Sequence, residues 1–270
     1  SRLTLILCPL AVVPVWREQF AIHCSNGMQV IALDTGVASQ RVARAAQAVV
    51  WSDESREPVV VVTNYDVARA EPFRGWMLSR LWDHVICDEV HRLKAPAGKG
   101  SWMAKALAKR AGARLGLTGT PMPHSPLDVY GYFRFVDSSV YGTSHTLFRA
   151  RYAIMGGFNN RQVVAYRNLD ELHERFYSVT HRVSVREVLD LPDSSDVTLQ
   201  CRLAKPAERV YRQLERDLVA DVKSGLVTAS NALVRLLRLS QITGGTVTND
   251  AGLADRVDES RIPEVARLTR

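Results

Sequence analysis

The chain has 270 residues, of which 46% are hydrophobic and 23% charged, as in folded globular proteins and unlike disordered or collagen-like chains. Its net charge of +7 favours polyanionic partners such as nucleic acid. No apolar run is long enough to cross a bilayer and the four cysteines show no CxxC spacing, so we expect no membrane span and a reduced cytoplasmic protein without disulfides or a zinc site.

Short apolar runs alternate with helical patterns over the first half of the chain. The predicted strands are Leu3–Cys8, Met28–Leu33, Pro58–Thr63, His84–Asp88 and Arg114–Thr118. The predicted helices are Pro14–Cys24, Ala38–Trp51 and Ser101–Ala111, the last with Ser101 as its cap and Gly112 as its stop. This alternation predicts an α/β fold, with a parallel sheet sandwiched by helices and ligands at the carboxyl ends of its strands.

The second half predicts a different organisation. Aromatic residues and irregular helical patterning between Val136 and His181 favour a mostly helical segment. Alternation over Asp196–Leu203 predicts a half-buried strand. Further on we expect helices at Pro206–Lys223 and Ala229–Ile242, a stop at Gly244-Gly245, and a loop from Thr246 to Ser260.

The most informative segment is the strand end at which Asp88 and Glu89 are followed by His91. Many NTPases use a buried strand ending in Asp-Glu to hold a hydrated Mg²⁺ and to orient an attacking water. We therefore assign Asp88 to Mg²⁺, through water, and Glu89 to the activation of water. A solvated acidic pair is the alternative, whereas a zinc HExxH site is excluded because the two histidines at i and i+4 are missing.

A second apolar run, about thirty residues later, ends in Thr118-Gly119-Thr120-Pro121. Two hydroxyls around a glycine can bond to the segment containing Glu89 and His91 and relay its state. A strand-to-helix turn with threonine as a cap is the alternative for this segment. His91 is the predicted coupling residue between the two segments, with a simple capping role as its alternative.

Together these segments resemble the first RecA-like lobe of superfamily 2 helicase-like ATPases, in the DEAH-related, chromatin-remodeller-like translocase branch. The matching segments are Leu5–Leu10 with Trp16–Phe20 (motif Ia), Val62–Asp66 (motif Ib), Val85–Lys94 (motif II), Leu117–Pro121 (motif III), His181-Arg182, Asp190–Pro192 and Tyr211 (after a helical protrusion) and Leu236–Gln241 (the helix before the second lobe). Met122–Asp128 also resembles phage-encoded members.

The resemblance implies ATP and Mg²⁺ as cofactors, double-stranded DNA as partner, and the cytoplasm of a bacterium or a phage-infected host. Thr118, Gly119 and Thr120 would couple hydrolysis to movement. The implied domains are a RecA-like lobe at 1–136, a helical protrusion at 137–190, a returning strand and linker helices at 191–245, and a loop leading to a second lobe at 246–270.

Two parts of the family pattern are not found in the sequence. The phosphate-binding loop GxxxxGK[ST] should precede motif Ia, and a second lobe with its arginine finger should follow the last residues. We therefore expect a P-loop NTPase lobe without its P-loop unit, with an open sheet edge, inactive alone. Ala97–Ser101 lacks the spacing to replace that loop.

Two other functions remain open at this point. A catalytically incomplete DNA-binding or scaffold module would have the same sequence. A translocation subunit of a restriction or repair complex would keep the same chemistry and change only the partner.

Seven basic residues and no acid occur from Arg92 to Arg114, and they are Arg92, Lys94, Lys99, Lys105, Lys109, Arg110 and Arg114. Such a run can be a solvated helix face or, beside ATPase carboxylates, a phosphate contact. Following the resemblance, the predicted contacts with the tracked strand are Pro9, Thr63, Asn64, Lys94 and Lys99. Binding of this kind has little sequence preference and a steep salt dependence. The core, rather than base stacking, is the expected place of Trp16, Phe20, Tyr130 and Phe133.

Overall fold

The computed structural model of the chain describes residues 3–24, 27–184, 187, 198, 200–223, 225–229 and 231–260. They belong to two units, Ser1–Val183 and Ser184–Arg270, each with a hydrophobic core of its own. No helix in these ranges has the length and apolarity needed to span a membrane.

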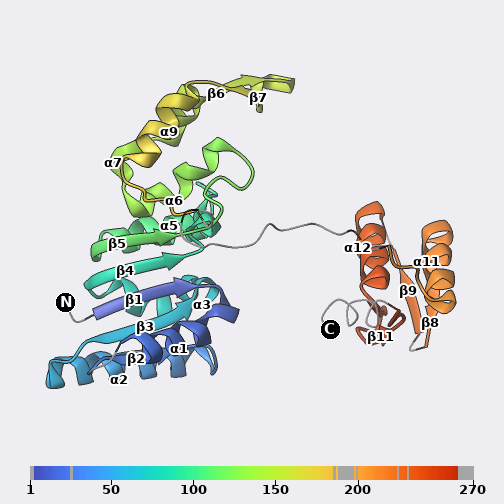
Figure 1. The fold of residues 1–270 in the computed structure, drawn as a ribbon, viewed down its shortest axis with the longest axis horizontal. Helices are drawn as coiled ribbons and strands as arrows, with labels where there is room; N and C mark the ends of the chain where they lie inside the picture. The colour runs from blue at the N-terminus through green and yellow to red at the C-terminus, as the bar shows by residue number, and fades with distance from the viewer. Residues whose placement is uncertain are drawn as a thin grey trace. The chain divides into compact units, whose positions relative to one another are not determined.

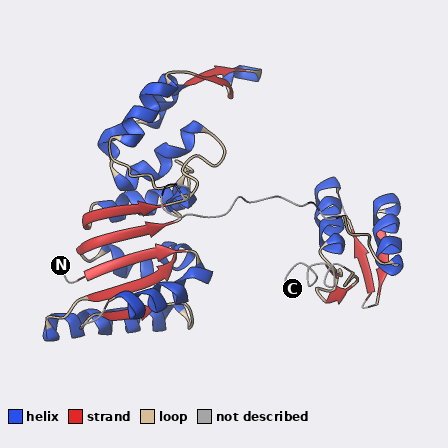
Figure 2. Ribbon diagram, in the orientation of Figure 1, coloured by secondary structure: helices blue, strands red, loops and turns tan. Residues whose placement is uncertain are grey.

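A parallel sheet of five strands lies at the centre of the first unit, in the order β2-β3-β1-β4-β5 (Figures 1 and 2). The strands are β1 (Leu3–Cys8), β2 (Gln29–Ala32), β3 (Val59–Asn64), β4 (Trp82–Asp88) and β5 (Ala111–Leu117). Every neighbouring pair is parallel. The five predicted strands and the parallel α/β fold are therefore confirmed.

The central strands are buried on both faces. Along β1, Leu5 and Leu7 belong to one core whereas Ile6 and Cys8 belong to the other, and β3 alternates in the same way. One core is covered by α1 and the other by helices α2 to α6. Continuous apolar runs such as Val59–Val62 follow from this, because neither face of these strands meets water.

The three helices predicted for this part of the chain are found as α1, α2 and α5, and the remaining helices named here were not predicted. In chain order the helices are η1 (Leu10–Val12), α1 (Val13–His23), α2 (Ala38–Ser55), α3 (Tyr65–Arg69), α4 (Phe73–Leu78), η2 (Val90–Leu93), α5 (Lys99–Ala108), η3 (Pro126–Asp128) and α6 (Val129–Val136). The prediction for α5 was wrong at both ends. Ser101 lies inside the helix, buried, and Gly112 lies in β5, because pairing with β4 begins at Ala111.

Strand β5 forms one edge of the sheet. It pairs with β4 on one side, its residues 112–115 are exposed, and the side chain of Leu115 is 50% exposed. An exposed edge of this kind presents backbone N–H and C=O groups to any further strand. Which edge of the sheet a P-loop strand would cover stays a prediction.

Beyond α6 the first unit continues into a segment of helices and one hairpin. Its elements are α7 (Ser138–Tyr141), α8 (His145–Tyr152), β6 (Ala153–Gly156), η4 (Phe158–Asn160), β7 (Gln162–Tyr166) and α9 (Leu169–Tyr177). In Figure 1 the β6–β7 hairpin lies at the far tip of this segment. The helices were predicted and the hairpin was not, although Gly157 and Asn159, both with positive φ, supply its turn.

Aromatic rings hold this segment against α6. Phe133 of α6 contacts Tyr141 and Phe176 at ring-centroid distances of 4.8 and 5.8 Å, and Tyr130 contacts Phe148 at 4.9 Å. These rings are all buried in the same core as the sheet residues. The segment is thus packed onto the sheet unit through α6, and Tyr130 and Phe133 are core residues, as predicted.

From residue 200 onward, the described residues of the second unit form two helices and two hairpins. Its elements are α11 (Lys205–Asp217), β8 (Val219–Val222), β9 (Gly225–Thr228), α12 (Ala232–Thr243), β10 (Thr246–Thr248) and β11 (Ala254–Arg256). The helices α11 and α12 were predicted, and Gly244 caps the second. Their core includes Leu214, Val227 and Ile242.

Three predictions for this unit need correction or lie out of reach. The helix predicted to reach Lys223 ends at Asp217, because Leu218 adopts a left-handed conformation with φ 60° and β8 follows. The predicted loop Thr246–Ser260 contains the antiparallel β10–β11 hairpin. Of the strand predicted at Asp196–Leu203, residues 196, 197 and 199 lie outside the described residues and the others are not in a strand. Asp190–Pro192 also lie outside them.

The predicted domain boundaries stay predictions, because the division between the two units falls at Val183 and Ser184 and tests none of them directly.

Candidate functional site

The carboxyl ends of neighbouring strands bring the two predicted motifs together. Strand β4 ends at Asp88 and β5 ends at Leu117, and these two residues are partners in the ladder. The chain therefore leaves the sheet at adjacent points, with Glu89 following one strand and Thr118 the other. Residues some thirty positions apart in sequence become neighbours through strand pairing alone.

Asp88 is held by three hydrogen bonds. Its Oδ1 accepts from the backbone N–H of Glu89 at 2.9 Å and its Oδ2 accepts from the indole N–H of Trp16 at 3.1 Å. Its backbone carbonyl accepts from the hydroxyl of Tyr65 at 2.6 Å. Burial raises the pKa of Tyr65 well above its usual value, so this hydroxyl stays protonated and remains a donor.

The next residue, Glu89, has an unusual backbone. Its φ of 51° and ψ of 50° lie in the left-handed region, which costs a residue with a side chain about 1–2 kcal/mol. The turn ends β4 at once and starts the short helix η2. Strained residues of this kind concentrate at functional sites, and the Glu89 side chain is 42% exposed.

A chain of polar contacts links Glu89 to the end of β5. Nδ1 of His91 lies 2.8 Å from Oγ1 of Thr118 and 3.1 Å from Oε2 of Glu89. The Thr118 hydroxyl donates to the same Glu89 oxygen at 3.4 Å. A hydroxyl that donates to Glu89 can accept from an Nδ1–H of His91 at the same time. The three side chains therefore form one connected group across the two strands.

Thr120 and Gly119 are the other two residues predicted to couple hydrolysis to movement, and they differ in their contacts. Thr120 joins the group, since its hydroxyl lies 3.4 Å from Nδ1 of His91 and its backbone N–H donates to Oγ1 of Thr118 at 3.1 Å. Gly119 makes no side-chain contact by definition, and a Cβ added there would meet nothing within 4 Å. Crowding therefore does not require glycine at this position.

The carboxylates match the preferences of Mg²⁺. This ion takes oxygen ligands and usually needs one or two protein carboxylates, with water and phosphate completing its shell. Asp88 and Glu89 supply such oxygens at one strand end. Within the described ranges no cluster of three or more His, Cys, Asp or Glu residues could hold a metal by itself. The residues thus fit a magnesium ion that arrives with a phosphorylated ligand.

The five predicted nucleic-acid residues fall into two groups. Pro9 and Lys94 are half-buried and Lys99 is exposed, so all three offer surface to a ligand. Thr63 is fully buried, and Asn64 is 7% exposed with its Oδ1 accepting from the backbone N–H of Val67 at 2.8 Å. The prediction that Thr63 and Asn64 contact nucleic acid does not fit their burial, because α3 begins directly over the end of β3.

The loop between Lys94 and Lys99 packs against α6. Arg134 of α6 is 9% exposed and donates to the carbonyl of Pro96 at 2.6 Å. A side chain at Gly131 would overlap the carbonyl of Lys94, so α6 packs directly beneath the loop. Sequence reasoning missed Arg134, since a single arginine in an aromatic helix carries no signal for a buried role.

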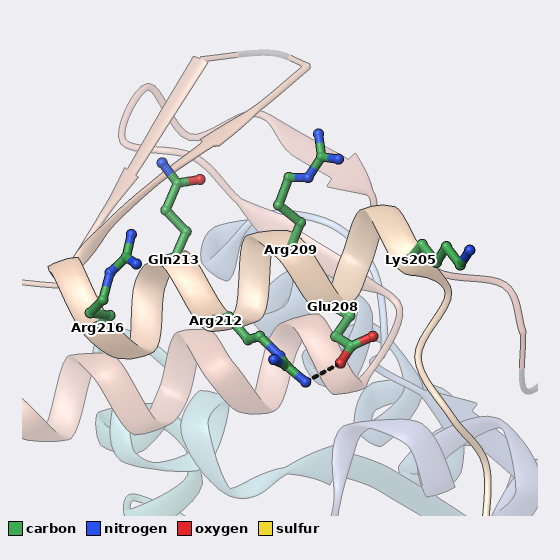
Figure 3. Close-up of a pocket in the computed structure, with 6 residues that line it drawn as sticks. All are labelled: Lys205, Glu208, Arg209, Arg212, Gln213 and Arg216. Atoms are coloured by element: carbon green, nitrogen blue, oxygen red, sulfur yellow. Dashed lines mark hydrogen bonds and ion pairs between the residues drawn. The ribbon is translucent and has the colours of Figure 1, made fainter.

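A second basic surface, also missed, lies on α11 in the C-terminal unit. Figure 3 shows the residues that line a shallow hollow there, Lys205, Glu208, Arg209, Arg212, Gln213 and Arg216. Two of its cations are paired locally, Arg212 with Glu208 at 2.6 Å and Arg216 with Asp217 at 2.8 Å. These acids lower the net charge of the surface, and exposed pairs of this kind contribute little stability.

Comparison with known proteins places this arrangement in context. The model of a family described as SNF2-related domain matches residues 2–244. The mouse (Mus musculus) DNA excision repair protein ERCC-6 is 23% identical, and the match covers 96% of this chain and 18% of that protein. Putative protein p41 of Acyrthosiphon pisum secondary endosymbiont phage 1 is 24% identical, and the match covers 93% of this chain and 55% of that protein.

A solved structure has a similar fold. The Sulfolobus solfataricus SWI2/SNF2 ATPase core in complex with dsDNA has a TM-score of 0.52 and 20% identity, covering 98% of this chain and 53% of that chain. The chain therefore spans about half of that structure and a smaller share of the mouse repair protein.

Replacing Thr118 tests the connected group. We expect Thr118→Val to lower the free energy of unfolding of the 270-residue chain by about 1 kcal/mol, because His91 and Glu89 lose a shared hydrogen-bond partner. Thr118→Ser keeps the hydroxyl and should stay near wild type. Urea unfolding followed by circular dichroism measures both variants. Equal stability of the valine and serine variants would show that the hydroxyl contributes nothing there.

Proposed function

The chain belongs to the SNF2-related domain family, and on that premise we propose that it is the first RecA-like lobe of an ATP-dependent motor that moves along double-stranded DNA. The parallel sheet and the likeness to a SWI2/SNF2 ATPase core solved with dsDNA support this proposal. Similarity to a phage protein supports a bacterial or phage-infected cytoplasm as its location.

The observation that carries the proposal is the connected group formed by Glu89, His91 and Thr118. An acidic pair after a strand is common, and so is a threonine turn. Their hydrogen bonding through a histidine, across the ends of two paired strands, is not expected of a solvated acidic pair or a capping threonine. It is what a lobe needs if the state of its catalytic carboxylate is to reach a second strand.

The two carboxylates have different surroundings, and the proposed chemistry gives each a different role. Bound Mg²⁺-ATP would supply a γ-phosphate polarised for attack by water. Asp88, whose two carboxylate oxygens accept from two N–H donors, would hold the ion through water. Glu89, whose side chain is freer and 42% exposed, accepts the proton of the attacking water. A positioned base of this kind contributes roughly 10²–10⁴-fold to the rate.

Movement would be coupled through the same contacts. Glu89 changes its charge and hydrogen bonding as it takes up a proton, and Thr118 and His91 share its Oε2. Such a change can favour one of two positions of the segment from Thr118 to Thr120. Coupling in this sense requires two arrangements that nucleotide and DNA both bias.

We further propose that the 270-residue chain does not turn over ATP alone. The segment Ala97–Ser101 ends a loop and opens α5, with Gly98 as N-cap, instead of following the first strand of the sheet as a phosphate-binding loop does. The family's arginine finger belongs to a second lobe. A scaffold or DNA-binding module without turnover is the alternative function.

Nucleic acid would lie over the carboxyl-terminal end of the sheet, where Pro9, Lys94 and Lys99 are found. The backbone of the loop between the two lysines is held by α6, which fixes the point from which the Lys94 side chain extends. Contacts of lysine with phosphate position the ligand and carry no sequence information.

The proposed catalytic role is tested by Glu89→Gln in the intact motor, that is, in a polypeptide that joins this lobe to a phosphate-binding loop and a second RecA-like lobe. We call it the full-length polypeptide. We expect DNA-stimulated ATP turnover to fall roughly 10²–10⁴-fold, because the amide cannot accept the proton, while binding of DNA and of nucleotide stays near wild type. Turnover is measured with and without double-stranded DNA. Glu54→Gln, at an exposed position of α2, is the matched control and should change nothing.

The same experiment separates the two functions. An intact protein that binds DNA and never hydrolyses ATP would leave the scaffold function standing. Full turnover in the Glu89 variant would remove Glu89 from the chemistry.

Replacing Lys94 and Lys99 together by alanine tests the DNA contact. We expect the slope of log affinity against log salt to fall by about 2, since each lost phosphate contact removes nearly one released counterion. Fluorescence anisotropy of a labelled duplex at several salt concentrations measures the slope. Lys109→Ala is the control, because Lys109 lies at the opposite end of α5. A slope that falls equally in both proteins would contradict the predicted location.

A further inference from the structure

Trp16 reaches from α1 to the end of β4. It lies 72 positions before Asp88, and its Nε1 is 3.1 Å from Oδ2 of that carboxylate. Its ring is half-buried, packs against the core under α1 and lies 6.0 Å from the ring of Phe20. The sequence predicts a core role for this residue, and the packing agrees with it. The hydrogen bond to Asp88 was not predicted.

The hydrogen bond from Trp16 is the second of two that constrain the carboxylate of Asp88. An indole N–H can only donate, and with the backbone N–H of Glu89 on Oδ1 each oxygen of Asp88 has one fixed partner. Together the two bonds fix both side-chain torsions of Asp88. Each carboxylate oxygen still has a further lone pair for a metal-bound water.

Packing alone does not account for this arrangement. A phenylalanine at position 16 would fill much of the same space against Phe20 and Val13 without offering a donor. An indole N–H usually finds a partner when its ring is buried. Here the partner is the side chain to which the metal role is assigned.

We propose that Trp16 is a positioning residue for Asp88, holding the carboxylate in the orientation that receives Mg²⁺ through water. This inference rests on the proposed function, because it assigns Trp16 to the same site. Outer groups that orient metal-binding side chains commonly change metal affinity about 10–100-fold when they are removed. A fixed carboxylate need not be ordered when the ion arrives.

The first measurement tests the bond in the 270-residue chain. The chain has five tryptophans, so its ¹⁵N spectrum has five indole N–H signals. The signal that is missing in Trp16→Phe is the one from Trp16. We expect that signal to shift and to exchange faster with water in Asp88→Ala, while the other four stay in place. A Trp16 signal that is unmoved in Asp88→Ala would overturn the inference.

The second measurement tests the consequence for the metal without using turnover. Electron paramagnetic resonance of free Mn²⁺ gives the affinity of the full-length polypeptide for Mn²⁺-ADP. We expect Trp16→Phe to weaken it about 10-fold, with a fall in the thermal unfolding midpoint no larger than the loss of one hydrogen bond causes. Trp102→Phe is the control, because the Trp102 ring is 57% exposed on α5, and its affinity should equal wild type.

The possible outcomes separate the positioning role of Trp16 from the proposed function on which it rests. Equal affinity in wild type and Trp16→Phe would overturn the positioning role and leave the motor intact. A wild-type protein that binds no Mn²⁺-ADP would overturn the proposed function and the positioning role with it. A weaker affinity accompanied by a loss of stability well above that of one hydrogen bond would assign the effect to disturbed packing and so contradict the inference.

Discussion

The pairing of β4 with β5 is the constraint on which the site depends. The register that sets Asp88 beside Leu117 fixes where both strands end, and every contact between the two motifs follows from it. A shift of one residue would turn each side chain to the opposite face of the sheet. Burial of Val85 and Cys87 in the core opposes such a shift. Hydrophobic packing of β4 thereby sets the distance from His91 to Thr118.

The same sheet supports a strained residue at the carboxyl end of β4. Glu89 adopts a left-handed backbone, and the hydrogen bonds around it oppose relaxation: its N–H donates to Asp88, while Thr118 donates to its side chain. Tyr65 adds a bond to the carbonyl before it. Neighbouring elements α1, α3 and β5 therefore hold one short turn from several sides. A site held in this way changes between discrete arrangements more readily than it deforms.

The sequence predicts the strands β1 and β3 well because both are continuous apolar runs that are largely buried on both faces. It predicts the motif residues because Asp88, Glu89 and Thr118 directly follow such runs. It fails where tertiary contacts decide. Ser101 has the chemistry of a cap, yet its hydroxyl donates to the carbonyl of Gly131 inside the core. Gly112 has the chemistry of a helix stop, yet it lies inside β5.

Long-range partners of single residues are also beyond the reach of sequence patterns. Trp16 shows the apolar character of a core residue, and nothing in its neighbourhood reveals that Asp88 is its acceptor. Thr63 matches a motif residue in type and place, but only the structure shows that it is fully buried. In the second unit, Leu218 ends α11 by a left-handed turn that leucine rarely adopts, so a helical pattern continued through it was the natural prediction.

The central claim is that the ends of β4 and β5 act as one unit in hydrolysis. A double-mutant cycle on His91→Ala and Thr118→Val, read out as DNA-stimulated ATP turnover of the full-length polypeptide, tests it most directly. The account predicts that the double variant loses little more than the worse single variant, because both changes break the same connected group. Losses that multiply would mean that the two residues act independently, and would contradict the account.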